Sequence, residues 1–445
     1  MGLLLAIALL PGTAASSTAQ GGTHLSGTFR DGAQWQIDVP TKWNGVALLY
    51  SHGYVRENLP ASPPVDDGQF IKAALLSEGY GLVASNYVGM GWVVESAVGD
   101  QLAALAEFRR EIGTPRMTIA WGESMGGMIT TDIAEYHPSA INGSLALCGL
   151  VAGGVAEYNA LLDSTFAAKT LLAPSSSVPL VNLGTVAEAV ADGQKLARVV
   201  SHAQASAAGR ARIALAAAFY DEPVYNDVGQ TVPRPGDWDR QEFNQYQGFL
   251  TNIIKGNYLF RVSGEQHAGG TLSWNTGVNY GSLLDNSASA AEVRALYRRA
   301  GLSLSADLRT LDHAARVTAQ ARGVNYMTHF VSFSGRLTKP QLDIHTTGDG
   351  LVPVQGEQAY RRLVAGAGRS ALLRQAYVNA PGHCTFTQGE ELAGIRAVVD
   401  RVRTGRWSDT SPSVLNAVAA RLDPRYAQTF VAYQPSRYLR PFARH

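Results

Sequence analysis

The stretch Met117-Thr-Ile-Ala-Trp-Gly-Glu-Ser-Met-Gly126 carries the strongest structural signal in this chain. Residues 117–121 form a short, nearly continuous apolar run, typical of a strand buried on both faces of a parallel sheet. A helical pattern over 125–136 follows directly, and Gly-x-Ser-x-Gly joins the two. Glycine on either side of the serine removes side chains that would collide with neighbouring backbone on so sharp a turn. We predict that Ser124 is a nucleophile at this turn; the alternative is a buried serine at a glycine-rich junction.

Further apolar runs of the same kind indicate a repeated strand-helix-strand order. These runs are residues 45–50, 81–85 and 143–147, and the sheet pattern resumes at 341–345 and 372–378. Helical patterns over 70–77 and 97–112 separate the first of them, and 24–30 with 34–39 is typical of an antiparallel hairpin. The pattern predicts an α/β fold with a doubly wound, mostly parallel sheet.

The regular alternation stops between the strands predicted at 143–147 and 341–345. Alanine-rich helical stretches over 157–172 and 185–215 appear there, followed by a polar and aromatic section over 220–280. We expect a large, mainly helical lid inserted into one sheet domain. The expected organisation is 1–20 leader, 21–149 first part of the core, 150–337 lid, and 338–445 second part of the core with a tail that wraps the surface.

A nucleophilic serine needs a base, and the base needs an acid that fixes its tautomer. In such folds the chain order is serine, acid, histidine. Asp349 and His383 each follow a predicted strand in a glycine-containing loop, so both face the carboxyl edge of the sheet. We predict that Asp349 orients His383 and that His383 is the general base.

Other residues compete for these roles. His345 lies within the strand that leads to Asp349, and we interpret it as a packed sheet residue. The remaining alternative histidines, which could touch substrate without being the base, are His267, His313 and His329. Asp163 and Asp221 are alternative acids near the start of the lid.

Backbone amides are the expected donors to a developing oxyanion. The amide of Met125 directly follows the serine, and Ser51-His-Gly-Tyr54 directly follows an apolar run. We predict that the amides of Met125 and Tyr54 form the oxyanion hole, with the glycine allowing close approach.

Composition narrows the possible functions. The chain has 37 Lys and Arg against 36 Asp and Glu, a net charge of +1, so no overall field recruits nucleic acid. His-Glu-x-x-His, a phosphate-binding loop and a strand-linked Gly-x-Gly-x-x-Gly are all missing from the sequence, so we expect no metal and no cofactor. We also expect no membrane span, because no later stretch is long and apolar enough. The oligomeric state is not predictable.

The first residues resemble an export signal. An apolar run over 3–10 is followed by Pro11-Gly12 and small residues to Ala19, although no Lys or Arg precedes it. We expect a secreted protein, extracellular or periplasmic. In such a protein the two cysteines, Cys148 and Cys384, favour a disulfide; the alternative is two buried thiols.

Together these motifs resemble the α/β-hydrolase fold family of serine hydrolases. The resemblance rests on Ser51-His-Gly-Tyr54, Gly122-Glu-Ser-Met-Gly126, Gly348-Asp349 and Gly382-His383. The loop 86–91 also resembles the family's loop after its fourth strand, but lacks the Arg often found there. The pair His383-Cys384 is similar to secreted feruloyl esterases and tannases, whose histidine-adjacent cysteine is disulfide-linked. In that group the partner directly precedes the serine, a place held here by Glu123, which leaves Cys148 as the partner.

The resemblance implies a secreted esterase that cleaves small carboxylic esters through an acyl-enzyme. We expect lid aromatics to wall an apolar or aromatic pocket: Tyr220, Tyr225, Trp238, Tyr246, Phe249, Tyr258, Phe260 and Trp274. An aminopeptidase or acyltransferase would use the same three residues. The peptidase would need an acid for the substrate's amine, for which Glu123, Glu157 and Asp163 are candidates. A catalytically silent binding protein is the remaining class.

Overall fold

The computed structural model describes residues 15–17, 22–57, 69–423, 425, 427 and 429–443. Apart from a short strand over 15–17, the expected leader over 1–20 lies outside the described residues. Among the helices of the described part, none has the length and apolar character needed to span a bilayer.

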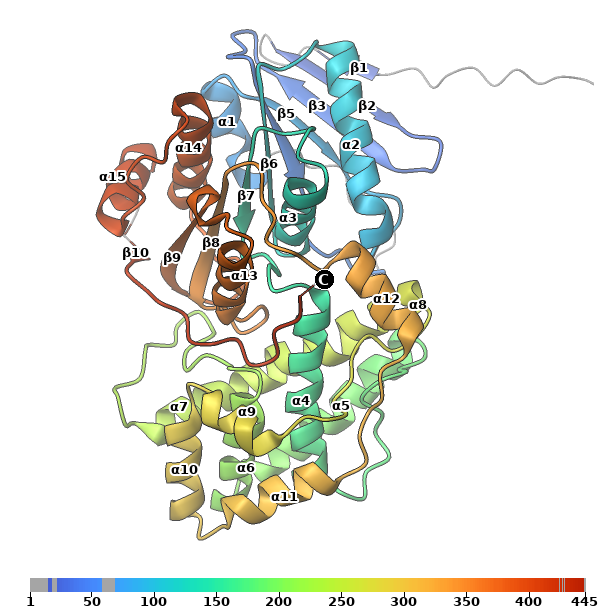
Figure 1. Ribbon diagram of the computed structural model, residues 1–445, viewed down its shortest axis with the longest axis vertical. Helices are drawn as coiled ribbons and strands as arrows, with labels where there is room; N and C mark the ends of the chain where they lie inside the picture. The colour runs from blue at the N-terminus through green and yellow to red at the C-terminus, as the bar shows by residue number, and fades with distance from the viewer. Residues whose placement is uncertain are drawn as a thin grey trace, which may run out of the picture.

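The core of the described chain is one sheet with the strand order β1-β2-β3-β5-β4-β6-β7-β8-β9-β10 (Figure 1). The strands from β5 to β9 in this order run parallel, while the β1, β2, β3 and β10 pairings are antiparallel. The bounds are β1 Ala15–Ser17, β2 Thr23–Thr28, β3 Gln34–Val39, β4 Val46–Ser51, β5 Gly81–Ser85, β6 Met117–Glu123, β7 Gly143–Leu147, β8 Gln341–Gly348, β9 Leu373–Pro381 and β10 Phe430–Val431. The predicted α/β fold, its hairpin and its parallel strands are confirmed.

Helices cover both faces of this sheet, as the doubly wound prediction requires. One face packs on α1 (Lys72–Ser77), α14 (Gln388–Thr404) and α15 (Pro412–Leu422). The other packs on α2 (Val94–Glu111), α3 (Met125–Tyr136) and α13 (Gln355–Gly366). Because both faces are covered, β4 to β8 are almost wholly buried; β4 to β7 are mostly apolar, while β8 also buries Gln341, Asp343 and His345.

A layer of helices lies between β7 and β8 in the chain and beneath the sheet in Figure 1. Its elements are α4 Gly154–Leu172, α5 Val186–Ala203, α6 Ala207–Ala218, α7 Trp238–Gly248, the π-helical turns η2 Phe249–Ile253 and η3 Gly256–Phe260, α8 Arg261–Ala268, α9 Tyr280–Asn286, α10 Ala290–Arg299, α11 Leu304–His313 and α12 Ala321–Phe330. We call this layer the insertion. The expected domain boundaries at 149/150 and 337/338 stay predictions.

The alanine-rich pattern over 185–215 forms two helices instead of one. The hydroxyl of Ser206 caps α6 by accepting a hydrogen bond from the Gly209 amide at 2.9 Å. A side chain at Gly209 would come within 1.9 Å of the Ala203 carbonyl oxygen, so the glycine allows α5 and α6 to meet closely. The cap at Ser206 thus starts a new helix within an alanine-rich stretch whose helix propensity alone predicts one continuous helix.

The tail does more than wrap the surface. It adds β10 to the sheet edge beside β9 and then runs to the junction of core and insertion, where Figure 1 marks the C-terminus. Tyr438 is buried there and Arg440 forms an ion pair with the buried Asp163 of α4. The tail therefore links the sheet to the insertion.

Candidate active site

Ser124 lies at the predicted turn between β6 and α3. Its backbone has φ 57° and ψ −124°, a strained conformation for a residue with a side chain. A Cβ at Gly126 would lie 1.9 Å, and one at Gly122 2.4 Å, from the carbonyl oxygen of Ser51. Both glycines are therefore required for β4 and the turn to pack this closely, as the sequence predicts.

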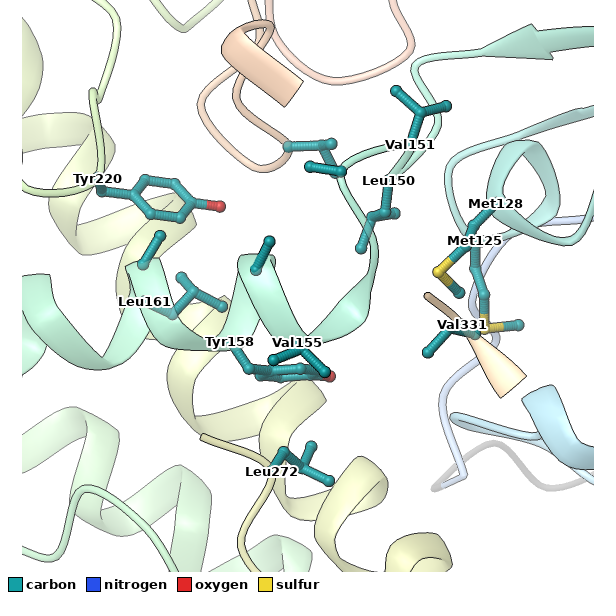
Figure 2. Close-up of a cluster of buried hydrophobic side chains, with 14 of the residues drawn as sticks. Met125, Met128, Leu150, Val151, Val155, Tyr158, Leu161, Tyr220, Leu272 and Val331 are labelled. Atoms are coloured by element: carbon teal, nitrogen blue, oxygen red, sulfur yellow. The ribbon is translucent and has the colours of Figure 1, made fainter. Parts of the chain in front are cut away.

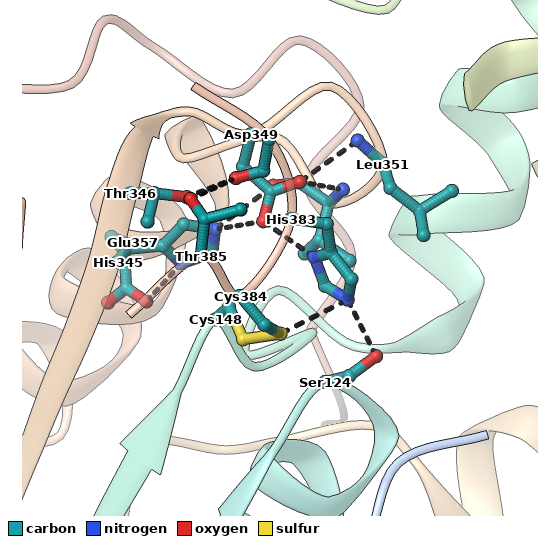
Figure 3. The surroundings of a disulfide bond; sticks show 12 residues. Ser124, Cys148, His345, Thr346, Asp349, Leu351, Glu357, His383, Cys384 and Thr385 are labelled. Atoms are coloured by element: carbon teal, nitrogen blue, oxygen red, sulfur yellow. Dashed lines mark hydrogen bonds and ion pairs between the residues drawn. A yellow bond between two sulfur atoms is a disulfide. The ribbon is translucent and has the colours of Figure 1, made fainter. Parts of the chain in front are cut away.

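The structure brings Ser124, Asp349 and His383 together (Figure 3). His383 Nε2 lies 2.8 Å from Ser124 Oγ, and His383 Nδ1 lies 2.7 Å from Asp349 Oδ2. The serine follows β6, while the other two side chains come from the loops after β8 and β9, all at the carboxyl edge of the sheet. The arrangement can transfer the serine proton to the imidazole; the catalytic roles themselves stay predictions.

Asp349 is wholly buried and fully hydrogen-bonded. Its Oδ1 accepts from the amides of Leu351 and Val352, each at 2.9 Å. Burial alone would raise the pKa of Asp349, but the charge of His383 and hydrogen bonds from His345 and His383 outweigh it and hold this pKa well below its usual range. The acid is therefore ionised at neutral pH.

A disulfide joins Cys148, just after β7, to Cys384 in the loop of His383, with the two Cα atoms 5.5 Å apart. Both cysteines have positive φ, 42° and 52°, so each sits on a sharp turn. Cys384 Sγ lies 3.3 Å from His383 Nε2. These atoms are spaced closely enough to suggest metal ligands, but sulfurs bonded to each other are not the thiolates that bind metal.

The loop predicted to supply the oxyanion donor packs directly on the serine. A Cβ at Gly53 would lie 3.3 Å from Ser124 Cβ. His52 stacks on Tyr87 with ring centroids 4.0 Å apart, and the Tyr87 hydroxyl donates to the His52 carbonyl at 3.1 Å. Met125 begins α3, where backbone amides lack partners within the helix. The oxyanion role of Tyr54 and Met125 stays a prediction.

An enclosed, mostly apolar cavity with a water-accessible volume of about 30 Å³ adjoins Ser124. Figure 2 shows part of its lining, with Tyr158 and Leu161 on α4 and Met125 at the start of α3. The other lining residues besides Ser124 are Tyr54, Trp92, Leu150, Glu157, Gly256, Phe260, Leu351 and Val352. Of the lid aromatics expected to wall the pocket, Phe260 lines this cavity. Trp92 and Tyr158 are aromatics that the sequence analysis missed.

Glu157 is the buried acid of this cavity. The hydroxyl of Tyr220 lies between Glu157 Oε1 and the carbonyl oxygen of Leu351, which is 2.6 Å away. The Tyr220 hydroxyl has one proton and two acceptors within reach, Glu157 Oε1 and the Leu351 carbonyl oxygen. Burial, together with the charge of Asp349, raises the pKa of Glu157 to about 8, although the Tyr220 hydrogen bond opposes this.

A neutral Glu157 predicts a specific pH dependence of stability. The folded chain keeps a proton that the unfolded chain loses near the usual value of 4.5, so the unfolding free energy falls as pH rises from there to about 8. In wild type we expect the contribution of Glu157 to the unfolding free energy to fall by about 1.4 kcal/mol per pH unit between the two pKa values. In Glu157→Gln this dependence on pH should be lost. Urea unfolding at about pH 5 and pH 8 measures it. Glu111→Gln, on the exposed end of α2, is the control; equal pH slopes in wild type and Glu157→Gln would contradict a neutral Glu157.

The rival histidines lie elsewhere. His267 pairs with Glu95 at 2.6 Å, and His313 and His329 are exposed on the insertion. His345 is buried, as expected of a packed sheet residue, but it also lies 3.3 Å from Asp349 Oδ2 and 3.0 Å from Glu357 Oε1. His345 lies near the end of β8 and Asp349 directly follows this strand, a closeness in sequence that could have suggested this contact.

The rival acids also have other partners. Asp221 accepts from the Ser287 hydroxyl at 3.0 Å, and burial raises its pKa to about 7. Asp163 binds Arg440 and accepts from Tyr280 at 2.9 Å. Glu123 lies against Glu391 of α14, and the charge and hydrogen bond of Glu123 add to the effect of burial in raising the Glu391 pKa. With Glu157 neutral, none of the acids considered for an amine presents an unshared carboxylate to the cavity.

Comparisons with known proteins give one sequence relative and distant structural neighbours. No family model matches the chain. It is 27% identical over 424 residues to an o-phthalyl amidase of Xanthobacter agilis, covering 89% of this chain and 91% of that protein. Feruloyl esterase B of Aspergillus oryzae has a TM-score of 0.41 at 14% identity, covering 87% of this chain and 81% of its own. The acylaminoacyl peptidase of Pyrococcus horikoshii has a TM-score of 0.35 at 11% identity, covering 91% and 41%.

The fold itself follows from the coordinates. The parallel strands follow the order β5-β4-β6-β7-β8-β9, with antiparallel β3 beside β5. The glycine-flanked serine follows β6, the acid follows β8 and the histidine follows β9. This strand order, with serine, acid and histidine in that chain order at the carboxyl edge, is the α/β-hydrolase fold, and this chain has it.

Proposed function

We propose that this protein is an exported serine hydrolase that cleaves carboxylic esters, with Ser124 as nucleophile, His383 as general base and Asp349 as the orienting acid. The observation that carries the proposal is the continuous line of contacts from Ser124 Oγ through His383 to Asp349, at 2.8 Å and 2.7 Å, beside an apolar cavity. A hydroxyl in contact with a carboxylate-bound imidazole is the arrangement that activates serine.

The proposed reaction has two halves. His383 Nε2 takes the serine proton as Oγ attacks the acyl carbon, and the amides of Tyr54 and Met125 hold the resulting oxyanion. The imidazolium then gives this proton to the leaving alcohol, and the acyl group stays on Ser124. Water, deprotonated by His383, attacks the acyl-enzyme and releases the acid. As the bond between the acyl carbon and Oγ breaks, the imidazolium returns the proton to Ser124 Oγ, so the enzyme is restored.

Export and a lid role for residues 150–337 belong to the same proposal. The disulfide supports an oxidising compartment, where such bonds persist. The cavity is closed by residues from both core and insertion, such as Tyr54 and Phe260, whose rings lie 4.6 Å apart.

A second candidate is hydrolysis of amides, favoured by the amidase that resembles this chain over most of its length. The same groups would act, with the proton of His383 passing to an amine. Because the acids near the cavity are neutral or paired, an aryl or acyl amide fits the site better than a peptide with a free amino terminus.

A matched substrate series tests the proposal. Nitrophenyl esters from acetate to palmitate and benzoate, with the corresponding nitroanilides, give kcat/KM for each acyl group. Since the cavity is small and partly aromatic, we expect acetate, butyrate and benzoate to exceed palmitate by at least about tenfold. Faster anilides than esters would favour the amidase, and no turnover of any substrate would contradict both candidates.

A further inference from the structure

His345 is buried beside the proposed catalytic acid but outside the cavity (Figure 3). Its Nε2 lies 3.0 Å from the carbonyl oxygen of Val352 and 3.3 Å from Asp349 Oδ2. Its Nδ1 lies 3.0 Å from Glu357 Oε1 on α13. The ring therefore bridges the acid loop to the helix that follows it.

The contacts of the ring fix its protons. A carbonyl oxygen only accepts, so Nε2 carries hydrogen. On the other side, Glu357 Oε2 accepts from Gln375 at 2.6 Å, which suits a carboxylate, and Nδ1 then donates to Oε1. With both nitrogens protonated, the imidazole is a cation between two carboxylates.

The charges around the ring agree with this assignment. Burial would lower the pKa of His345, but hydrogen bonds to Asp349 and Glu357 and their negative charges outweigh it and raise this pKa to about 10. The other acids nearby favour the neutral form: burial and the charge of Glu357 raise the pKa of Asp343, and burial with the charge of Asp349 raises the pKa of Glu157 to about 8.

Asp349 Oδ2 receives both imidazoles. His383 Nδ1 lies 2.7 Å from this oxygen and His345 Nε2 lies 3.3 Å from it, while Oδ1 is held by backbone amides. The carboxylate thus cannot rotate without losing contacts on both oxygens, and a second positive charge lies close to the side facing His383.

We propose that His345, held by Glu357, is a positioning residue that aims Asp349 Oδ2 at His383 and offsets part of the negative charge acting on that imidazole. The proposal rests on the proposed function for its link to catalysis. A cation so near disfavours protonation of His383, so it keeps the base available at lower pH than Asp349 alone would allow.

The test is a pH titration of three variants. In His345→Gln a positive charge is lost, and we expect the pH at which the His383 imidazole signal changes, followed by NMR on histidine-labelled protein, to rise by about one unit. Glu357→Gln removes a negative charge and shifts the change in the opposite direction. The double variant removes one charge of each sign and should return close to the wild-type pH.

Kinetics add a second readout. The acidic limb of kcat/KM should shift in the same directions, and kcat should fall about tenfold in His345→Gln with little change in KM, because His345 does not line the cavity. Circular dichroism checks that each variant folds; if His345→Gln does not, Glu357→Gln still decides the sign.

A failure of the His345 inference can be distinguished from a failure of the proposed function. A loss of kcat with no shift in the NMR titration or the acidic limb means that His345 only packs, and overturns the inference. If wild type hydrolyses no ester or amide, the proposed function fails, yet the NMR titration still supports or overturns the role of His345.

Discussion

Ser124→Ala should lower kcat by about five orders of magnitude while leaving the fold and KM nearly unchanged. Only the hydroxyl oxygen is lost, and it makes the 2.8 Å contact to His383 Nε2. The strained backbone at this residue is set by Gly122 and Gly126 and not by the hydroxyl, so alanine is expected to occupy the same turn. The measurement is kcat and KM on the preferred ester, with circular dichroism of both proteins.

Ser77→Ala is the matched control for this variant. Ser77 is exposed at the end of α1, and its hydroxyl donates to the Ala74 carbonyl at 2.7 Å, far in the fold from the cavity. Its activity should equal wild type. A fluorophosphonate should label wild type and Ser77→Ala but not Ser124→Ala. Turnover or labelling that survives in Ser124→Ala would disprove the assigned nucleophile.

Loss of the disulfide is expected to have the largest effect on stability. Cys148 and Cys384 are separated by 236 positions, and closing such a loop stabilises the fold by up to about 5 kcal/mol in the chain-entropy model. We expect Cys148→Ala/Cys384→Ala to lower the free energy of unfolding by several kcal/mol and Tm by about 5 °C. Since the bond anchors the loop of His383 to the end of β7, kcat should fall as well.

Reductant provides the control for the second prediction. The sequence contains two cysteines, so a thiol reductant should destabilise wild type and leave the double variant unaffected. Thiol counting on the unfolded, unreduced protein should find none. Two titratable thiols, or equal stability of wild type and the double variant, would argue against the bond.

The parallel core was predictable because the features that determine it lie within short stretches of the sequence. Strands covered on both faces read as continuous apolar runs, as 143–147 does, and the predicted run matches β7 residue for residue. Glycine at 122 and 126 similarly marks a turn that no side chain could enter. The positions of Ser124, Asp349 and His383 followed because each directly succeeds such a strand.

The remainder depends on contacts between distant segments. Glu157 reads as one charged residue on an apolar helix, and its neutral state arises from burial and the charge of Asp349, neither of which its own neighbourhood reveals. His345 was correctly expected to pack, but its charge depends on Glu357, which α13 brings back to the sheet. The tail was expected on the surface because its prolines and arginines suit exposure, whereas Arg440 meets the buried Asp163.

The disulfide also determines what a single proteolytic cut would do to this chain. Cys148 precedes the whole insertion and Cys384 follows it, so a single cut anywhere between them yields two fragments that remain covalently joined. Ser124 stays on one fragment and His383 on the other, with sulfur connecting them. A nicked molecule should therefore migrate as one band on a gel without reductant and as two with it, and it can retain its site where an unbridged chain would dissociate.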